Sequence, residues 1–152
     1  MTTEYALPMP AERLIPHRSP MRLVDTLLSR TDGGGVTDSR LPANAILADE
    51  RGMLDEVTFV ELIAQSYAAV RGYIDLIDGK PAAKGFLVGI RHLKITGKAI
   101  SGDRLLTSIR TVGTFEGFAV IEGTVTRDAE TVASGSIKVW LVEQGKDVGG
   151  NP

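Results

Sequence analysis

The chain has 152 residues, of which 43% are hydrophobic and 24% are charged, with a formal net charge of −2 at pH 7 and no cysteine. These values are typical of one globular domain, and they exclude disulfides, thiolate catalysis and cysteine-based metal sites. The slight acidic excess argues against a nucleic-acid-binding protein, because such proteins usually carry a basic face. The first residues, MTTEYALPMPAER, lack a signal-peptide pattern, and no apolar run reaches about 18 residues. We therefore expect a cytoplasmic protein that does not contact membranes.

The first informative segment is LIPHRSPMRLVD, residues 14–25. It places His17 and Arg18 between two prolines, which restrict the backbone on either side. From residue 21 onward, the pattern predicts a strand over residues 21–30, a glycine-rich turn over 31–35 and a second, shorter strand over 36–42. We expect one domain over residues 1–144, with a loose start at residues 1–10 and a flexible tail at residues 145–152.

A single long helix is predicted over residues 55–77. Asp55 can cap its N-terminus, and its apolar side chains cover most of the circumference, as expected for a buried helix. One narrow stripe of the helix differs, because it consists of an acid, an amide and small side chains. Its residues lie on one face of the helix, since they follow one another at spacings of three or four. The stripe consists of Glu61, Gln65, Ala68 or Ala69, and Gly72.

Four β-rich stretches follow the helix, at residues 85–96, 104–113, 117–127 and 131–142. The last of them, TVASGSIKVWLV, alternates most clearly, with Ala133, Ile137 and Val139 on one face. The segment FEGF predicts a hairpin turn. The order of elements predicts an α+β fold in which an antiparallel sheet wraps its apolar face around one helix.

Three motifs, in this order, resemble the hotdog-fold 3-hydroxyacyl-acyl-carrier-protein dehydratases. LIPHRSPMRLVD resembles their opening motif, VELIAQSYAAV their central helix, and FLVGIRHLKITGKAISGDRLL the next strand and turn. The likeness covers residues 13–142. It is closest to the dehydratase-like branch encoded with aryl polyene pathways, which carries a segment like Phe86 to Arg91. The resemblance implies a hotdog fold, with a curved antiparallel sheet wrapped around one long central helix, and a dimer whose sheets join edge to edge.

The activity implied by the resemblance is dehydration of 3-hydroxyacyl thioesters on acyl carrier protein, in a fatty-acid or polyene/polyketide pathway. This reaction needs a base for the C2 proton, an acid for the departing C3 hydroxyl and donors for the thioester oxygen. Glu61 is the candidate acid and His17 the candidate base. For substrate binding, the free N–H groups at Val57 and Thr58 would serve the thioester oxygen, and Gln65 is a further candidate.

Basic side chains are candidates for contact with the carrier protein. Arg91 would suit the phosphate of the phosphopantetheine arm or the acidic carrier surface, as part of a basic rim. The other members of the rim are Arg18, Lys94, Lys98 and Arg104. A solvated face of scattered charges is the plainer interpretation.

The chain departs from the family at the catalytic histidine. In the well-known dehydratases this residue lies in a His-Phe-Pro-Gly motif ahead of the helix, and the matching position here is Leu47. His17 is then the remaining candidate base, although its motif can equally be structural, with the imidazole bonded to the backbone. Glu61 can likewise be a buried acid bonded to Gln65 or to an arginine. We expect His92 to be a surface or edge residue.

Two other functions stay open at this point. A non-catalytic hotdog subunit that pairs with an active dehydratase is favoured by the missing histidine, and a hotdog acyl thioesterase needs only an acid on the central helix. No metal or cofactor is predicted, because two histidines without cysteine make a poor ligand set. The predicted partners are acyl carrier protein and a second hotdog subunit, in a homodimer or heterodimer, with no nucleic acid and no membrane.

Overall fold

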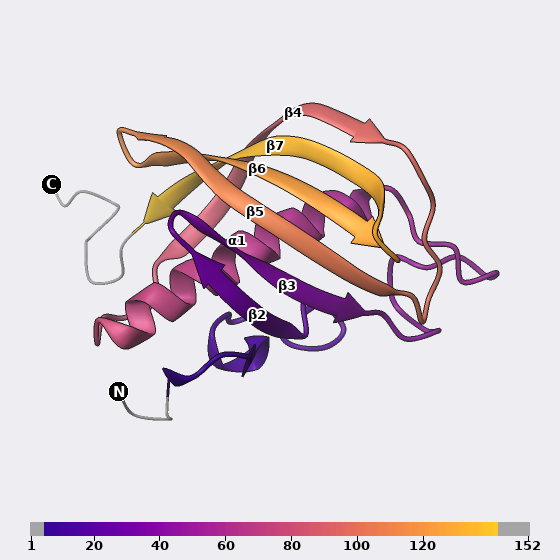
Figure 1. Ribbon diagram of the computed structural model, residues 1–152, viewed down its shortest axis with the longest axis horizontal. Coiled ribbons are helices and arrows are strands. Elements are labelled where there is room, and N and C mark those ends of the chain that lie inside the picture. Colours follow the sequence, from indigo (N-terminus) through magenta and orange to yellow (C-terminus); the bar gives the residue numbers. More distant parts are fainter. Residues whose placement is uncertain (1–4, 143–152) are drawn as a thin grey trace, which may run out of the picture.

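Seven antiparallel strands form one sheet that curves around a single helix in the computed structural model (Figure 1), which describes residues 5–142. The strand order is β1-β2-β3-β5-β6-β7-β4, so that β4, which follows the helix in sequence, lies at one edge beside β7. The strands are β1 (Met9–Pro10), β2 (Thr26–Thr31), β3 (Gly34–Arg40), β4 (Lys84–Ile95), β5 (Arg104–Phe115), β6 (Phe118–Arg127) and β7 (Glu130–Val142).

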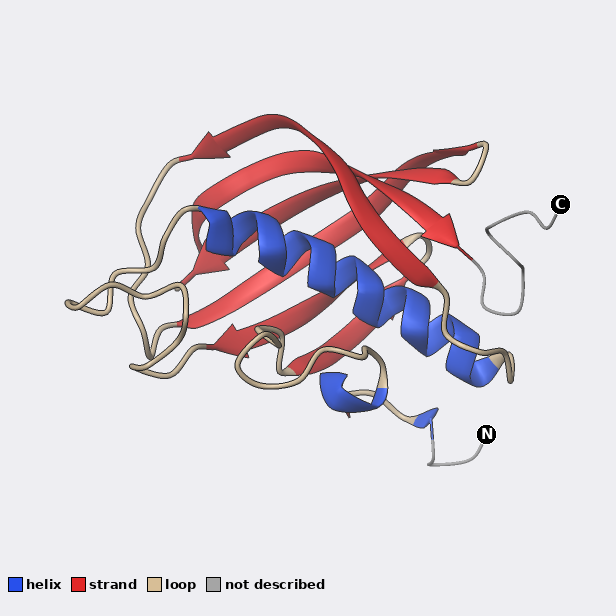
Figure 2. Ribbon diagram, turned by 180° about the vertical axis from the view of Figure 1, so that it is seen from behind, coloured by secondary structure: helices blue, strands red, loops and turns tan. Residues whose placement is uncertain are grey.

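The helix α1 (Val57–Ile77) lies across the concave face of the sheet (Figure 2). Its side chains Phe59, Leu62 and Ile63 are fully buried against the strands, which makes the helix the centre of the core. Asp55 acts at the helix start as predicted, because its Oδ1 accepts a hydrogen bond of 2.9 Å from Val57 N–H. The helix itself begins two residues after Asp55. It is not long and apolar enough to cross a membrane.

The strands after the helix follow the sequence prediction closely. In β7 the residues Ala133, Ile137 and Val139 are buried, as the alternation predicted. Phe115 pairs with Phe118 across a two-residue turn, where Glu116 and Gly117 have φ angles of 48° and 85°. Such a turn needs a positive φ at both central residues, which glycine adopts without strain.

The N-terminal segment is more ordered than the sequence indicated. Residues 1–4 lie outside the described part, but residues 5–10 are packed, because Met9 is 1% exposed and pairs with Leu27 in the sheet. The hydroxyl of Tyr73 also donates to the carbonyl of Tyr5 (2.7 Å). The prediction of a loose start is therefore wrong for these residues. The expected domain end at residue 144 and the tail at residues 145–152 lie outside the described residues.

The first predicted strand was placed too early. Residues 21–24 precede β2, and their backbone is held by a helix side chain, Gln65, instead of by a neighbouring strand. Just before them the segment crosses the helix at Gly72, where a Cβ atom would lie 2.0 Å from the carbonyl oxygen of Leu14. Only glycine permits this close approach. The segment is thereby fixed along one side of α1 (Figure 2).

Candidate functional site

One face of α1 forms the floor of an open cavity of about 610 Å³. The N-terminal segment 12–18 makes one wall, and the beginning of β4 with the end of β7 makes the other. The floor consists of Glu61, Ala64, Gln65, Tyr67, Ala68 and Arg71. This floor contains Glu61, Gln65 and Ala68 of the predicted stripe, and Ala64, Tyr67 and Arg71 in addition. Gly72, the last residue of the stripe, faces the N-terminal segment instead. The apolar wall residues are Phe86, Leu87, Val139 and Leu141.

Gln65 joins the helix to the N-terminal segment. Its side chain is 1% exposed, and its Oε1 accepts hydrogen bonds from Leu23 N–H (2.8 Å) and Val24 N–H (3.2 Å). Its Nε2 donates to the carbonyl of Met21 (2.9 Å) and to Oε1 of Glu61 (2.9 Å). Because all of its hydrogen-bonding groups are engaged, Gln65 is suited to hold the loop and to orient Glu61, and has little capacity left for a substrate.

The two predicted catalytic side chains line this same cavity. Glu61 is half-buried, and its Oε1 is oriented by the amide of Gln65. His17 is also half-buried, and its Nδ1 is fully buried without a hydrogen-bond partner among the described residues. A carboxyl group and an imidazole on a partly apolar cavity are the groups that general acid–base chemistry requires.

The loop that carries His17 is folded by its neighbour Arg18. The Nη1 of Arg18 donates to the carbonyls of Ile15 (2.9 Å) and His17 (2.8 Å), while its own carbonyl accepts from Met21 N–H (2.8 Å). Its guanidinium also lies 3.6 Å from the carboxylate of Glu12. These bonds explain how a short segment between two prolines keeps a fixed shape beside the helix.

Three further side chains that the sequence did not single out shape the other end of the cavity. Tyr67 and Arg71 line it, and Asp75 holds Arg71 at 3.5 Å. Burial raises the pKa of Tyr67 above its usual value; the Arg71 guanidinium opposes this shift and the Asp75 carboxylate adds to it. The spacing from Ala64 to Ala68 to Arg71 was the available signal, since it continues the stripe by one helical turn.

The remaining predicted binding residues lie outside the cavity lining. Val57 is 49% exposed, and the N–H groups of Val57 and Thr58 are already bonded to Asp55. Arg91 lies further along β4. The roles predicted for these residues stay predictions, and they are not brought together with Glu61.

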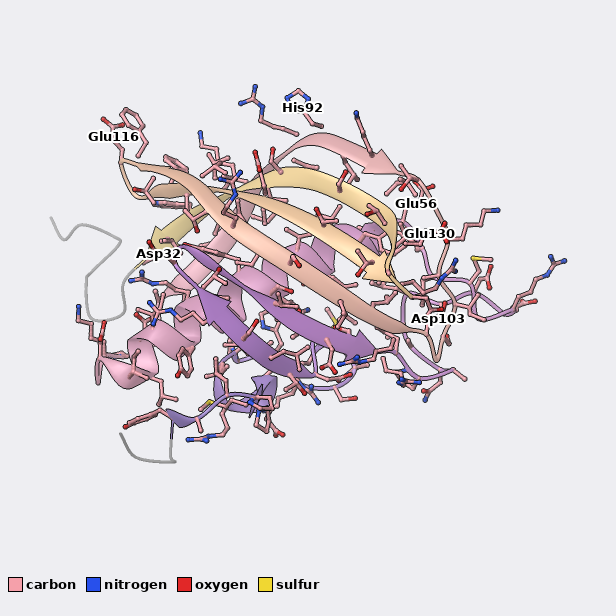
Figure 3. The ribbon with its side chains drawn as sticks, viewed as in Figure 1. Asp32, Glu56, His92, Asp103, Glu116 and Glu130 are labelled. Carbon is pink, nitrogen blue, oxygen red and sulfur yellow. The ribbon has the colours of Figure 1, made fainter. Side chains whose placement is uncertain are left out.

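His92 is exposed on β4, as expected from the sequence. Figure 3 shows it projecting away from the sheet at its edge. Its φ angle is 53°, and it lies within the register irregularity between Arg91 and Lys94. A β-bulge explains both features. His92 therefore does not belong to the cavity.

The sheet wrapped around one helix, with a cavity along that helix, defines the hotdog class. The dehydratase heterocomplex ApeI:P from Xenorhabdus doucetiae matches with a TM-score of 0.82 and 18% identity, over 90% of this chain and 93% of that chain. A hypothetical thioesterase with coenzyme A from Streptococcus pneumoniae matches with a TM-score of 0.61 and 13% identity, over 78% and 88% of the chains. At these identities the likeness establishes the fold, and it confirms the predicted one.

The family follows from the sequence comparisons. The family model of the ApeP-like proteins, described as ApeP dehydratase, matches residues 9–148, and the chain belongs to this family. The 3-hydroxyacyl-[acyl-carrier-protein] dehydratase FabZ of Streptococcus equi subsp. zooepidemicus (strain MGCS10565) is 28% identical over 129 residues, which are 83% of this chain and 91% of that protein. The resemblance to hotdog dehydratases that the motifs indicated is thus confirmed.

Proposed function

We propose that this protein dehydrates 3-hydroxyacyl thioesters carried on acyl carrier protein, with Glu61 and His17 as its catalytic pair. The observation that carries the proposal is that both side chains line one cavity with apolar walls, although they come from separate segments of the chain. The family and the FabZ relative support the same reaction.

The chemistry assigns one step to each residue. The imidazole of His17 removes the C2 proton while the carboxyl group of Glu61 gives its proton to the C3 hydroxyl, which leaves as water. The electrons of the C2–H bond form the C2=C3 double bond, and those of the C3–O bond leave with the water. Gln65 is a positioning residue in this scheme, because it bonds Glu61 and the backbone just after the histidine loop.

The assembly we propose is a hotdog dimer joined through β4. This strand lies at the sheet edge and exposes Phe86, Leu87, Val88 and Ile90, each by 41% or more. An apolar edge strand is a template for pairing with another strand. Since Phe86 and Leu87 also line the cavity, a partner at this edge would cover the site and shield it from water.

A second candidate is a non-catalytic subunit that serves an active hotdog partner. It is favoured by Leu47 at the position of the usual histidine, and by the heterocomplex named in the similar structure. In that case the cavity of this chain would shape the acyl tunnel and the partner would supply the chemistry.

The deciding experiment offers a 3-hydroxyacyl chain on acyl carrier protein to the purified protein and follows the intact mass. We expect the loss of one water, which Glu61→Ala and His17→Ala each reduce by at least about a hundredfold. Arg110→Ala, outside both the cavity and the predicted basic rim, is the matched control and retains the rate. Release of free carrier identifies a thioesterase instead. An unchanged substrate, with a folded protein, rejects catalysis by this chain alone and favours the non-catalytic subunit.

A further inference from the structure

Tyr67 and Arg71 bring hydrogen-bond donors to the end of the cavity away from Glu61. Tyr67 lines the cavity and is 7% exposed, and the described residues supply no hydrogen-bond partner for its hydroxyl. The Nε of Arg71 is fully buried and also has no partner among the described residues. The side chain as a whole is 35% exposed, so the donors of Arg71 that a ligand can reach are its Nη groups and not the buried Nε. Together with the Tyr67 hydroxyl, they suit a ligand that presents acceptor oxygens.

Arg71 is held in place by a buried carboxylate. Asp75 is 3% exposed, and its Oδ1 lies 3.5 Å from Nη2 of Arg71. The other oxygen, Oδ2, accepts a hydrogen bond of 3.0 Å from Ala83 N–H, which belongs to the cavity wall. Asp75 therefore fixes one corner of the guanidinium. A guanidinium that is oriented in advance is well suited to bind a phosphate or a carboxylate.

The charges of the cavity also differ between its two ends. Glu61 lies at one end of the floor and Arg71 ten residues further along the helix, which corresponds to about 15 Å at 1.5 Å per residue. Lys84, on the first residue of β4, lines the same cavity near Arg71's end of the helix. Glu12, the other acid of the lining, is paired with Arg18. Arg71 and Lys84 thus bring two cations to this end of the lining, and Asp75, which pairs with Arg71, lies outside the lining.

We propose that Arg71 and Tyr67 form an anion-binding subsite, which takes a phosphate or carboxylate group of a ligand whose reacting carbons lie at Glu61. The position of the reacting carbons rests on the proposed function. Two parts of a thioester substrate offer this chemistry at a distance from the thioester: the phosphate of a phosphopantetheine arm, and a carboxylate at the far end of an acyl chain. Arg71 supplies the charge, Tyr67 a neutral O–H donor, and Asp75 positions Arg71.

The experiment measures binding of two matched pairs of unreactive probes by isothermal titration calorimetry, on the full chain as purified. The first pair is pantetheine and 4′-phosphopantetheine. The second is an N-acyl pantetheine amide ending in a methyl group and the same amide ending in a carboxylate. We expect the anionic member of one pair to bind about tenfold more tightly, as one charge-assisted contact at a partly exposed site allows. The pair that shows this preference identifies the source of the anion.

Variants then assign the preference to its residues. We expect Arg71→Gln to abolish the preference for the anionic probe and Arg71→Lys to retain part of this preference. Tyr67→Phe should reduce the preference about threefold. Arg110→Gln removes a cation that pairs with Glu122 outside the cavity, and is expected to leave the anion preference unchanged. If Arg71→Gln does not fold, the reduction in Tyr67→Phe decides.

Two results overturn the subsite: a wild-type protein that does not discriminate within either pair, or a preference that survives both Arg71→Gln and Tyr67→Phe. Because the probes are not turned over, this outcome is separate from the fate of the proposed function. If the protein prefers the anionic probe but does not dehydrate its substrate, the subsite is supported and the catalytic role of this chain is rejected.

Discussion

Gln65 links the candidate acid to the backbone that follows the candidate base. Its four hydrogen bonds reach Glu61 on the helix and three residues that follow the histidine loop, which are Met21, Leu23 and Val24. Because the side chain is buried, these bonds are made in a low-dielectric environment, where an unpaired polar group is costly. We therefore expect Gln65 to matter for stability as well as for the geometry of the site.

Replacing Gln65 with methionine keeps the volume but removes all four bonds. The N–H groups of Leu23 and Val24 would be left buried without acceptors, so we expect the free energy of unfolding to fall by about 3 kcal/mol. Urea denaturation followed by circular dichroism measures this loss. Val57→Met, at an exposed position of the same helix, should change it by less than about 0.5 kcal/mol. A stable Gln65→Met protein would contradict the anchoring role.

Tyr67 provides a prediction of pH dependence. Burial raises its folded-state pKa above the ordinary value of 10.0, so the neutral phenol is favoured in the native protein. Its contribution to stability is complete below pH 10 and is lost as the pH rises through the raised pKa. The free energy of unfolding of the wild-type protein should therefore fall relative to that of Tyr67→Phe above pH 10. Below pH 9, about one unit under the ordinary pKa, the difference between the two proteins should not depend on pH.

The measurement is urea denaturation of both proteins at a series of pH values. A difference that stays constant through the alkaline range would mean that Tyr67 titrates normally. An absorbance titration of the phenolate provides an independent test, because the tyrosine missing from Tyr67→Phe should be one that ionises above pH 10.

At the scale of single residues, the sequence predicted the types of group but only part of their placement. Glu61, Gln65 and His17 were named from helix spacing and from a motif, and all three line one cavity. Tyr67 was not singled out, since its position on the circumference of the helix says nothing of a neighbouring cavity. Arg71 was missed because its relevance depends on Asp75 and on the loop before β4.

At the scale of elements, the contact between the N-terminal segment and α1 gives the cavity one of its walls. The contact depends on Gly72, where a Cβ would lie 2.0 Å from the carbonyl oxygen of Leu14 and 2.9 Å from its carbonyl carbon. Backbone atoms cannot rotate out of the way as a side chain can. The segment would have to move as a unit, together with His17.

Gly72→Ala is therefore expected to destabilise the fold by about 3 kcal/mol, even though alanine has the higher helix propensity. Gly113→Ala is the matched control, because nothing lies within 4 Å of a Cβ at that position. Thermal unfolding of the two variants and the wild-type protein compares them directly. Equal melting temperatures for Gly72→Ala and the wild type would show that the close approach can relax without cost.

At the scale of the whole molecule, the edge strand β4 should decide the assembly. Ile90 is 49% exposed on this strand, and a lysine there would place a charge where a second strand is expected to pair. We expect the wild-type chain to be dimeric by light scattering after size exclusion, and Ile90→Lys to be monomeric. Val112→Lys, at a 42% exposed position on the interior strand β5, should leave the dimer intact. A dimer that survives Ile90→Lys would locate the interface elsewhere.

The sequence by itself determined the fold class and the helix and strand pattern, because helical and alternating periodicities record which side chains are buried. It also named His17, Glu61 and Gln65, since these residues belong to local motifs. Only the tertiary structure decided that these three share a cavity with Tyr67 and Arg71, and that Val57, Thr58 and Arg91 lie outside its lining. The physical reason is that a cavity is bounded by segments distant in the chain, and their packing depends on long-range contacts, such as that of Gly72 with Leu14, which no local pattern encodes.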